Sequence, residues 1–410
     1  MATTTPTVAP RGPILVCYRQ DDGAATAQDI ANMLRAVGVP VWIDSSDMGV
    51  GTFDSTFHRA ARRGLSGTVF VATPNVVRSD FIREQEAPTW DALARDPDFI
   101  LAVVNDHPST ESDGVDYSFP DSLLRDVQSS LADFKQYPVS DPQYLDDLCR
   151  DITYRRLEIL RAEQDVPDDE LRLEIVTRAA PATAPTRWEI RSEIGPPLDG
   201  ETLLTAPHRA QTAALTRNLP RLADRLGVQT VRIRGGLHLP VAAAVGMALP
   251  ITRPGAVIFH DNTNAEWSSS GSATEIPELR TQGSSIGAAA GVAVLVDMVD
   301  AGEPEPAFDA MAQSLNIPSR TIALAVRSAI HPDAAVGLSR RIAAEIRDFA
   351  ATNPGPVRLA MRAPAGLALH LGRHLNTLDV DLYDLDRHRT EYVRFARARA
   401  GGPNIIMETA

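Results

Sequence analysis

Apolar runs of strand length alternate with amphipathic helical patterns along the first 164 residues of the chain. The run ILVCY at 14–18 ends in a polar turn, and apolar residues then recur at helical spacing from Ala27 to Val37. Further strand patterns follow at 39–44, 67–73, 99–106 and about 134–139, and a final helix is indicated at about 141–164. This rhythm predicts an α/β fold with a flavodoxin-like, five-stranded parallel sheet over residues 13–164.

The pattern changes after residue 164. Residues 1–12 read as a polar tail, and residues 165–170 (DVPDDE) read as a linker. Seven apolar strand patterns interleaved with Ala-rich helices then predict a second α/β domain over residues 171–410. Within this domain, the Ser- and Gly-rich stretch from Trp267 to Ser285 is predicted to be a surface loop.

An internal repeat is visible in the second domain. VRIRGGLHLPVAAAVGMAL begins at Val231 and VRLAMRAPAGLALHLGRHL begins at Val357, which gives an offset of 126 residues. Each copy reads as a strand, a turn and a helix, and each is followed by another strand of similar pattern. We therefore predict a duplication whose halves span about residues 171–285 and 286–410.

The charge distribution separates the two domains. The net charge is −13, and residues 1–165 carry 15 basic and 26 acidic side chains, whereas the remainder carries 25 and 27. This balance argues against a broad phosphate-binding surface, so DNA is not an expected partner. The nearly balanced second domain can still hold a local basic pocket for one small anion.

The sequence also carries few signs of export or membrane insertion. No apolar run is long enough to span a bilayer, and the N-terminal residues do not read as a secretory leader. The two cysteines, Cys17 and Cys149, lack any disulfide or metal-binding spacing. We expect a cytoplasmic protein with reduced thiols, no membrane partner and no metal.

Four motifs occur in order in the first domain. CYRQDDG ends the first strand, WID is followed by SSDMGVGTF, FVATPNVVRSDF follows the third strand, and glutamates lie just beyond it. Together they resemble a bacterial TIR domain over roughly residues 12–140, although Cys17 replaces the usual serine and Phe81 the usual tryptophan. The resemblance implies an NAD⁺ hydrolase, for which NAD⁺ is a substrate and no cofactor is needed.

The catalytic carboxylate of such domains commonly lies four residues after the aromatic residue. That position is Gln85 here, and Glu84 and Glu86 flank it. At 100° per residue, Glu84 stays closer to the Phe81 face of an α-helix, so Glu84 is predicted to be catalytic and Glu86 is the alternative. Both glutamates could also be ordinary solvated residues near a helix N-terminus.

The chemistry requires a carboxylate at this place. Cleavage of the bond between nicotinamide and ribose creates an oxocarbenium-like sugar, which a carboxylate stabilises. Nicotinamide is already a cationic leaving group, so no general acid is required. Ligands bind outside the strand ends of doubly wound sheets. The predicted NAD⁺-binding residues are accordingly Arg19, Asp44, Asp47, Phe53 and Phe81, with a surface salt bridge as the alternative role of Arg19.

In the second domain, the turns that follow the paired strands have the features of an anion site. RIRGGLHLP and MRAPAGL each connect a strand to a helix N-terminus, where backbone N–H groups and the helix dipole favour negative charge. The helical pair His370 and His374 lacks further metal ligands and reads as polar-face histidines. The predicted ligand-binding residues are Arg191, Arg234, Gly235, Gly236, His238, Leu239, Arg327, Ser328, Arg362 and Ala363.

The second domain resembles the SAVED domain over roughly residues 170–405. The residues that carry the resemblance are the helix start GLHLPVAAAVG and the later segment DLYDLDRHRTEYV. It implies two fused CARF-like units that bind a cyclic tri- or tetranucleotide as activator. A TIR domain fused to a SAVED domain is an architecture of CBASS antiviral effectors, in which NAD⁺ depletion depends on head-to-tail assembly into an oligomer or filament.

Two other functions remain open at this point. A TIR domain can serve as a non-enzymatic scaffold whose oligomer recruits a partner. A flavodoxin-like enzyme that processes nucleosides, such as a deoxyribosyltransferase, also places a glutamate near a ribose, but it leaves the SAVED-like half unexplained.

Overall fold

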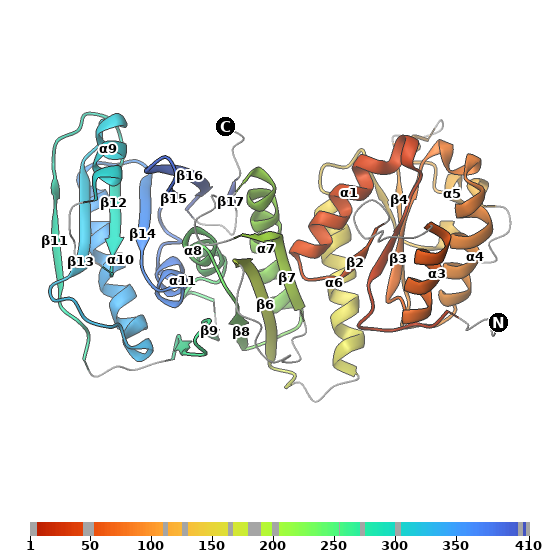
Figure 1. The fold of residues 1–410 in the computed structure, drawn as a ribbon, viewed down its shortest axis with the longest axis horizontal. Coiled ribbons are helices and arrows are strands. Elements are labelled where there is room, and N and C mark those ends of the chain that lie inside the picture. Colours follow the sequence, from red (N-terminus) through yellow and green to blue (C-terminus); the bar gives the residue numbers. More distant parts are fainter. Residues whose placement is uncertain are drawn as a thin grey trace. The chain divides into compact units, whose positions relative to one another are not determined.

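The chain folds into two compact units, Met1–Val166 and Pro167–Ala410, in a computed structural model (Figure 1). The structure describes residues 6–43, 53–109, 114–124, 130–162, 167–178, 190–198, 205–253, 255–270, 275–299, 305–400 and 405–406. Glu170, which the sequence places in the linker, is already the first residue of a strand.

The first unit is built on a parallel sheet. Its strands are β1 (Ile14–Cys17), β2 (Val41–Trp42), β3 (Gly67–Ala72), β4 (Ile100–Asn105) and β5 (Gln136–Pro138). Their order is β2-β1-β3-β4-β5 with all neighbours parallel, which confirms the predicted flavodoxin-like sheet. The helices and helical turns are α1 (Gln20–Ala36), α3 (Phe53–Arg63), η1 (Pro74–Arg78), η2 (Ile82–Glu86), α4 (Ala87–Leu93), α5 (Phe119–Leu123), η3 (Leu131–Asp133) and α6 (Tyr144–Ala162).

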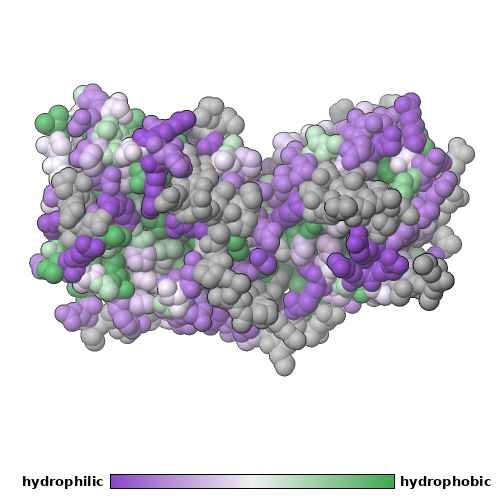
Figure 2. Space-filling view, viewed as in Figure 1, coloured by the Kyte–Doolittle hydropathy of each residue, from purple (hydrophilic) through white to green (hydrophobic). Residues whose placement is uncertain are grey.

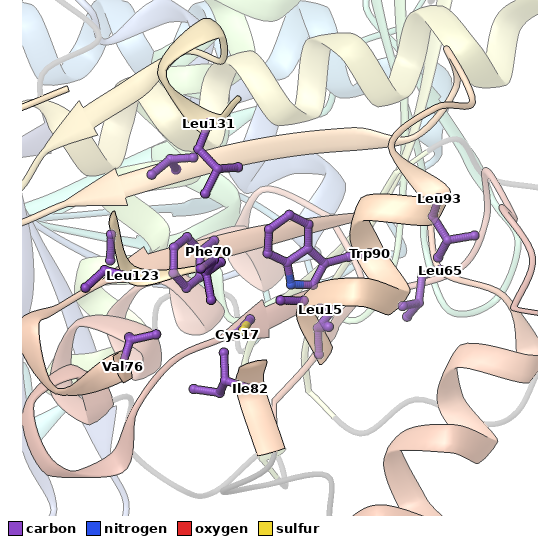
Figure 3. Close-up of a cluster of buried hydrophobic side chains, with 14 of the residues drawn as sticks. Leu15, Cys17, Leu65, Phe70, Val76, Ile82, Trp90, Leu93, Leu123 and Leu131 are labelled. Carbon is purple, nitrogen blue, oxygen red and sulfur yellow. The ribbon is translucent and has the colours of Figure 1, made fainter. Parts of the chain in front are cut away.

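The core of this unit lies between the sheet and the segment from η2 to α4. All four residues of β1 and all six of β3 are buried, as expected for central strands covered on both faces. Trp90 of α4 packs against Phe70 of β3, with ring centroids 5.8 Å apart. Figure 3 shows Cys17, at the end of β1, among these side chains and close to Ile82 of η2. The carboxyl end of β1 is therefore held by a closely packed core.

The N-terminal segment is docked and does not behave as a free tail over its described part. The backbone N–H of Ala9 donates to Leu65 O and that of Leu65 donates to Thr7 O. The buried guanidinium of Arg156, on α6, also donates to Gly12 O at 2.9 Å. Residues 6–12 thus extend the edge of the fold, since they supply partners for backbone groups of the loop before β3.

The second unit contains two sheets. The first has the order β10-β9-β8-β6-β7, and the second has the order β11-β13-β12-β14-β15-β16-β17. The first copy is formed by β6 (Glu170–Arg178), β7 (Ile190–Leu198), α7 (Ala206–Arg225), β8 (Thr230–Arg234), α8 (Leu239–Ala248), β9 (Ala256–His260) and β10 (Glu266–Ser268). The second is formed by β11 (Leu279–Ser284), β12 (Val292–Asp297), α9 (Pro306–Ser314), β13 (Ser319–Leu324), η4 (Pro332–Ala334), α10 (Ala335–Thr352), β14 (Val357–Arg362), α11 (Ala365–His374), β15 (Val380–Asp386), β16 (Glu391–Ala398) and β17 (Ile405–Ile406).

The two sheets repeat one topology. In the first, β8 pairs in parallel with β6 and β9, β6 pairs in parallel with β7, and β10 closes the edge antiparallel to β9. In the second, β14 pairs in parallel with β12 and β15, β12 pairs in parallel with β13, and β16 lies antiparallel to β15. The repeat therefore extends beyond the strand, turn, helix and strand visible in the sequence to five strands in each copy.

Helix α8 of the first copy packs closely against helix α11 of the second (Figure 1). A Cβ atom added at Gly246 of α8 would lie 1.9 Å from Leu369 O of α11, and one added at Gly372 of α11 would lie 2.2 Å from Ala243 O of α8. Adding the offset of 126 residues turns Gly246 into Gly372 and Ala243 into Leu369, so each contact is the counterpart of the other. Reciprocal contacts of this kind are those of a two-fold axis, so a pseudo-two-fold axis passes between α8 and α11.

The stretch predicted as a surface loop is partly strand. β10 and β11 both lie within or at the edge of 267–285, and β11 pairs antiparallel with β13 of the second sheet. β11 therefore joins the second sheet, although it precedes the boundary predicted at about residues 285 and 286. The side chains of β11 after Leu279 are exposed, which explains the polar composition that suggested a loop.

Hydrophilic residues cover most of the coloured surface visible in Figure 2, and hydrophobic residues form separate spots. The most exposed large apolar side chains are those of Ile286 and Val326. Among the described residues, no helix combines the length and apolar character that crossing a bilayer requires.

Candidate functional site

A cavity of about 280 Å³ opens at the carboxyl end of β1 in the first unit. This is the edge of a doubly wound sheet at which ligands bind. The cavity combines a cation, a carboxylate and aromatic rings. It is lined by Val16, Tyr18, Arg19, Gln20, Trp42, Ser79, Phe81, Ile82 and Glu86.

Glu86 reaches this cavity because the helix has a π-turn. In η2 the N–H of Ala87 donates to Ile82 O, five residues back, where an α-helix would bond four residues back. Pro88 supplies the reason, since its ring lacks an N–H and clashes with the carbonyl of Glu84 in a regular α-helix. The wider turn brings Glu86, five residues after Phe81, to the same cavity as that ring.

The geometric premise that favoured Glu84 is therefore wrong. The side chain of Glu84 is exposed and does not line the cavity, whereas Glu86 is only 4% exposed and does. The 100° rotation per residue assumed for an α-helix fails in a π-turn. Pro88, two residues after Glu86, is the sequence signal that points to this irregularity.

The buried carboxylate of Glu86 has a defined partner. The Cys17 thiol donates a hydrogen bond to Glu86 Oε2 at 3.0 Å, and both side chains are buried. At the start of the same helix, Ser79 Oγ accepts the N–H of Ile82 at 3.3 Å. The carboxylate therefore lies between a strand end and a capped helix start.

Arg19 and Phe81, two of the predicted NAD⁺-binding residues, line this cavity. Arg19 forms an ion pair with Asp21 at 3.0 Å, so its surface salt bridge is present alongside its position at the cavity. Asp44 and Asp47 lie outside the described residues, and Phe53 begins α3 with its side chain outside them. Their expected roles stay predictions.

Aromatic packing and a carboxylate fix the walls of this cavity. The ring of Phe81 makes an edge contact with Phe57 of α3, with centroids 5.6 Å apart. Asp22, in the first turn of α1, accepts the hydroxyl of Thr73 at 2.7 Å and the N–H of Asn75 at 3.0 Å. The turns after β1 and β3 are thereby held together beside the cavity.

A larger cavity of about 540 Å³ lies in the second unit. It is bounded by strand ends and turns of both copies, so it is a site that the duplication creates. Its lining residues are Arg178, His238, Leu239, Val299, Glu305, Met361, Arg362, Ala363, Asp384, Leu385, Arg387, Thr390 and Tyr392.

Two helices begin at this cavity. α8 starts at Leu239, after the N-cap His238, and α11 starts just after Ala363, with Pro364 as N-cap. Both helices direct the positive ends of their dipoles and their first N–H groups towards the same space. His238, Leu239, Arg362 and Ala363, predicted from two distant turns, are brought together here.

The start of α8 is rigidly attached to β6. The N–H of His238 donates to Thr177 Oγ1 at 2.9 Å, and Nδ1 of the same histidine lies 3.1 Å from this oxygen. Gly235 has φ of +142° and a Cβ atom there would lie 1.9 Å from Ile175 O. Only glycine permits this approach, and the carbonyl of Gly236 then accepts the N–H groups of Thr177 and Arg178.

Arg362 is held between two carboxylates at the cavity wall. Its Nη1 donates to Glu305 Oε2 at 2.8 Å and lies 3.9 Å from Asp297 Oδ2, which is fully buried. Burial, together with the carboxylates of Asp297 and Asp309, raises the pKa of Glu305, and the hydrogen bond from the backbone N–H of Ala307 opposes that rise. An anion at this wall would therefore meet an arginine that is already oriented.

Six of the predicted ligand-binding residues do not line the cavity, and two of these, Gly235 and Gly236, belong to the turn that leads into α8. Arg191 and Arg234 lie on β7 and at the end of β8, where both approach the carboxylate of Glu174. Arg327 and Ser328 follow β13 and are exposed. A strand-end position in the sequence does not define on which side of a sheet a side chain lies, and β13 is separated from β14 by β12.

Sequence reasoning missed most of the lining from the β15–β16 hairpin and from the connection before α9. Glu305 is the N-cap residue of α9, and Asp384, Arg387 and Tyr392 come from the hairpin. Burial raises the pKa of Tyr392. The segment DLYDLDRHRTEYV, which carries the family resemblance, is the sequence signal that points to this hairpin.

The paired histidines of α11 are buried and do not form a polar face. His370 Nε2 donates to Trp267 O at 3.0 Å, and Trp267 packs against Gly366 in the first turn of α11. Burial lowers the pKa of His370 to about 4, and burial together with nearby arginines lowers that of His374 to about 4. Both imidazoles are neutral in the folded unit at neutral pH.

We expect acid to destabilise the second unit through His370. A histidine whose folded pKa is about 4 binds its proton more readily in the unfolded chain, so its contribution to stability is complete above about pH 6.5 and is lost as the pH falls towards 4. The expected loss is about 3 kcal/mol in the free energy of unfolding. Urea unfolding at pH 7, 5.5 and 4.5 measures it.

Two variants separate this effect from general acid unfolding. His370→Gln keeps a donor for Trp267 O and should flatten the pH dependence, whereas His388→Gln changes an exposed histidine and should leave it unaltered. Equal pH dependence in the wild type and in His370→Gln would contradict the expectation.

Comparisons with known proteins define the class of each unit. A family model described as "TIR domain" matches residues 14–136. A family model for SAVED, described as "SMODS-associated and fused to various effectors sensor domain", matches residues 215–397. The chain therefore consists of a TIR domain followed by a SAVED sensor domain, as the sequence motifs indicated.

Solved structures with low sequence identity are also similar to this chain. The Acinetobacter baumannii Cap4 SAVED/CARF-domain containing receptor with the cyclic trinucleotide 2'3'3'-cAAA is 14% identical, with 84% of this chain and 83% of that chain covered and a TM-score of 0.44. The same receptor with 3'3'3'-cAAA is 12% identical, with 93% of this chain and 99% of that chain covered and a TM-score of 0.44. The Moraxella osloensis Cap4 SAVED/CARF-domain containing receptor is 12% identical, with 92% of this chain and 98% of that chain covered and a TM-score of 0.41. A search of curated proteins found no match.

Proposed function

We propose that this protein is an NAD⁺ hydrolase whose TIR domain is switched on when its SAVED domain binds a cyclic oligonucleotide, as in an effector of CBASS antiviral defence. The observation that carries the proposal is the buried carboxylate of Glu86 at a cavity that also presents Arg19 and Phe81. A volume of about 280 Å³ suits one end of a dinucleotide, since whole drug-sized ligands occupy about 300–1,000 Å³.

In the proposed reaction the bond between ribose C1′ and the nicotinamide nitrogen breaks, and the electron pair leaves with nicotinamide, which becomes neutral. Water adds to C1′ and releases a proton, so that NAD⁺ and water give ADP-ribose, nicotinamide and H⁺. The carboxylate of Glu86 holds ribose hydroxyls and offsets the positive charge that develops on the sugar. Arg19 is suited to the pyrophosphate, and Phe81 to an apolar wall beside the nicotinamide ring.

The SAVED cavity supports the sensing half of the proposal. Two helix N-termini and three arginines, Arg178, Arg362 and Arg387, outweigh the carboxylates of Glu305 and Asp384 around a space of about 540 Å³. Such a site favours a compact ligand with several negative charges over a neutral one. A cyclic tri- or tetranucleotide carries three or four phosphates, which would meet groups from both copies at once.

The link from ligand to catalysis is proposed to be head-to-tail assembly into an oligomer or filament. A ligand shifts this equilibrium only if it binds the assembled state more tightly than the single chain. A heterologous interface that does not close then produces a growing polymer.

The test is to incubate the full chain with NAD⁺, with and without cyclic tri- and tetranucleotides, while nicotinamide release and particle size are recorded together. We expect release only when one of these nucleotides is present, and larger particles under the same condition. Assembly without release would favour a non-enzymatic scaffold. Ligand-independent activity on nucleosides would favour a nucleoside-processing enzyme.

Two arginine variants show whether the cavity is the sensor. Arg362→Ala should weaken binding of the activating nucleotide by about 10- to 100-fold, because it removes a charged hydrogen-bond donor from the cavity wall. Arg327→Ala removes the same charge from an exposed turn away from the cavity and should bind normally. Equal affinities in a folded pair would place the activator elsewhere.

A further inference from the structure

The two buried cysteines of the first unit have different surroundings. Cys149 lies in the middle of α6, whereas Cys17 ends β1 and donates to Glu86 Oε2 at 3.0 Å. The bond connects residues 69 positions apart in the chain and joins the sheet to the π-turn. Figure 3 shows the sulfur of Cys17 within the packed core, with Ile82 of that turn nearby.

A carboxylate in such a position needs a donor that fixes its direction. An ionised carboxylate only accepts hydrogen bonds, and one that is buried without donors is strongly destabilised. The thiol of Cys17 comes from a strand that is buried along its whole length, which makes it a rigid donor.

We propose that Cys17 is a positioning residue, which orients the carboxylate of Glu86 towards the ribose of NAD⁺ through its S–H donor. The proposal rests on the proposed hydrolase activity of this cavity. A hydrogen bond donated to a carboxylate favours its ionised form over its protonated form. Cys17 itself lies outside the cavity lining and touches no substrate in this role.

The test compares three variants of the full chain with saturating activator. Cys17→Ala removes the donor and should lower kcat by about 10-fold with little change in KM, because orientation of the carboxylate matters most in the transition state. Cys17→Ser keeps a donor and should stay within about threefold of the wild type. Cys149→Ala changes the other buried cysteine and should leave kcat unaltered.

The pH profile of kcat/KM distinguishes positioning from packing. The acid limb should move to higher pH in Cys17→Ala and to lower pH in Cys17→Ser, because a hydroxyl is a stronger donor than a thiol. An acid limb that stays in place in Cys17→Ser overturns the proposal, even where Cys17→Ala does not fold. Thermal unfolding of each variant reports on folding.

The outcomes separate this inference from the proposed function. If the wild type releases no nicotinamide with any cyclic nucleotide, the hydrolase assignment fails. If the wild type is active, Glu86→Gln is inactive, and the Cys17 variants keep wild-type kcat and pH profile, only the role of Cys17 fails.

Discussion

Glu86→Gln is expected to lower activator-dependent nicotinamide release by about 10²–10³-fold, whereas Glu84→Gln is expected to retain it. The first change removes a negative charge from the cavity wall, where the ribose would become positively charged, and keeps the size of the side chain. The second makes the same chemical change on an exposed residue of the same helical turn. Release of nicotinamide at saturating NAD⁺ measures both.

Each variant needs a measurement that does not depend on catalysis. Because the proposed site for the cyclic nucleotide lies in the SAVED domain, its binding should be unchanged in both variants, as should the activator-dependent increase in particle size. Inactivity of Glu84→Gln together with activity of Glu86→Gln would restore the assignment made from ideal α-helical geometry. It would also mean that the π-turn is rearranged in the active assembly.

Gly246→Ala is expected to destabilise the second unit by about 3 kcal/mol, at the upper end of what an overpacked core costs. The added methyl group would lie 1.9 Å from Leu369 O, and backbone on the neighbouring helix cannot move aside as a flexible side chain can. Helices α8 and α11 must then separate, which also widens the cavity at their N-termini. Urea unfolding and binding of the activator measure the two effects.

Gly337→Ala is the matched control for this prediction. Gly337 is also a helical glycine of the second unit, but a Cβ atom there would meet only the Cδ1 and Cγ1 atoms of Ile276, at the end of a flexible side chain. This replacement should be close to neutral or slightly stabilising, because alanine favours a helix over glycine by about 1 kcal/mol. Equal losses in the two variants would show that the close contact between α8 and α11 is not the cause.

The motif order and the strand-helix rhythm of the first unit were enough to predict its fold and its TIR class, but not which of its two glutamates lines the cavity. Glu84 and Glu86 differ by two positions in the sequence and by a complete change of environment in the structure. The decisive feature is the missing N–H of Pro88, which replaces an α-turn by a π-turn. Periodicity arguments assume a regular helix and therefore fail where a proline interrupts it.

The second unit shows the same limit for charged residues. The repeat identified the two turns, and the structure brings His238 and Arg362 of these turns to one cavity. Arg191, Arg234 and Arg327 had equally suitable strand positions but pair with carboxylates on a sheet or lie in an exposed turn. Arg387 and Glu305 were not selected, because they come from connections whose course only the folded chain defines.

The sequence by itself determined the α/β class, the order of a TIR domain and a SAVED domain, and the duplication within the second. These properties depend on patterns of residues that are close together in the sequence, so the sequence alone predicts them. Only the tertiary structure decided which of two glutamates reaches the cavity beside Cys17, and which arginines surround the cavity on the pseudo-two-fold axis. Both choices depend on a turn geometry or a sheet face that brings together residues far apart in the chain.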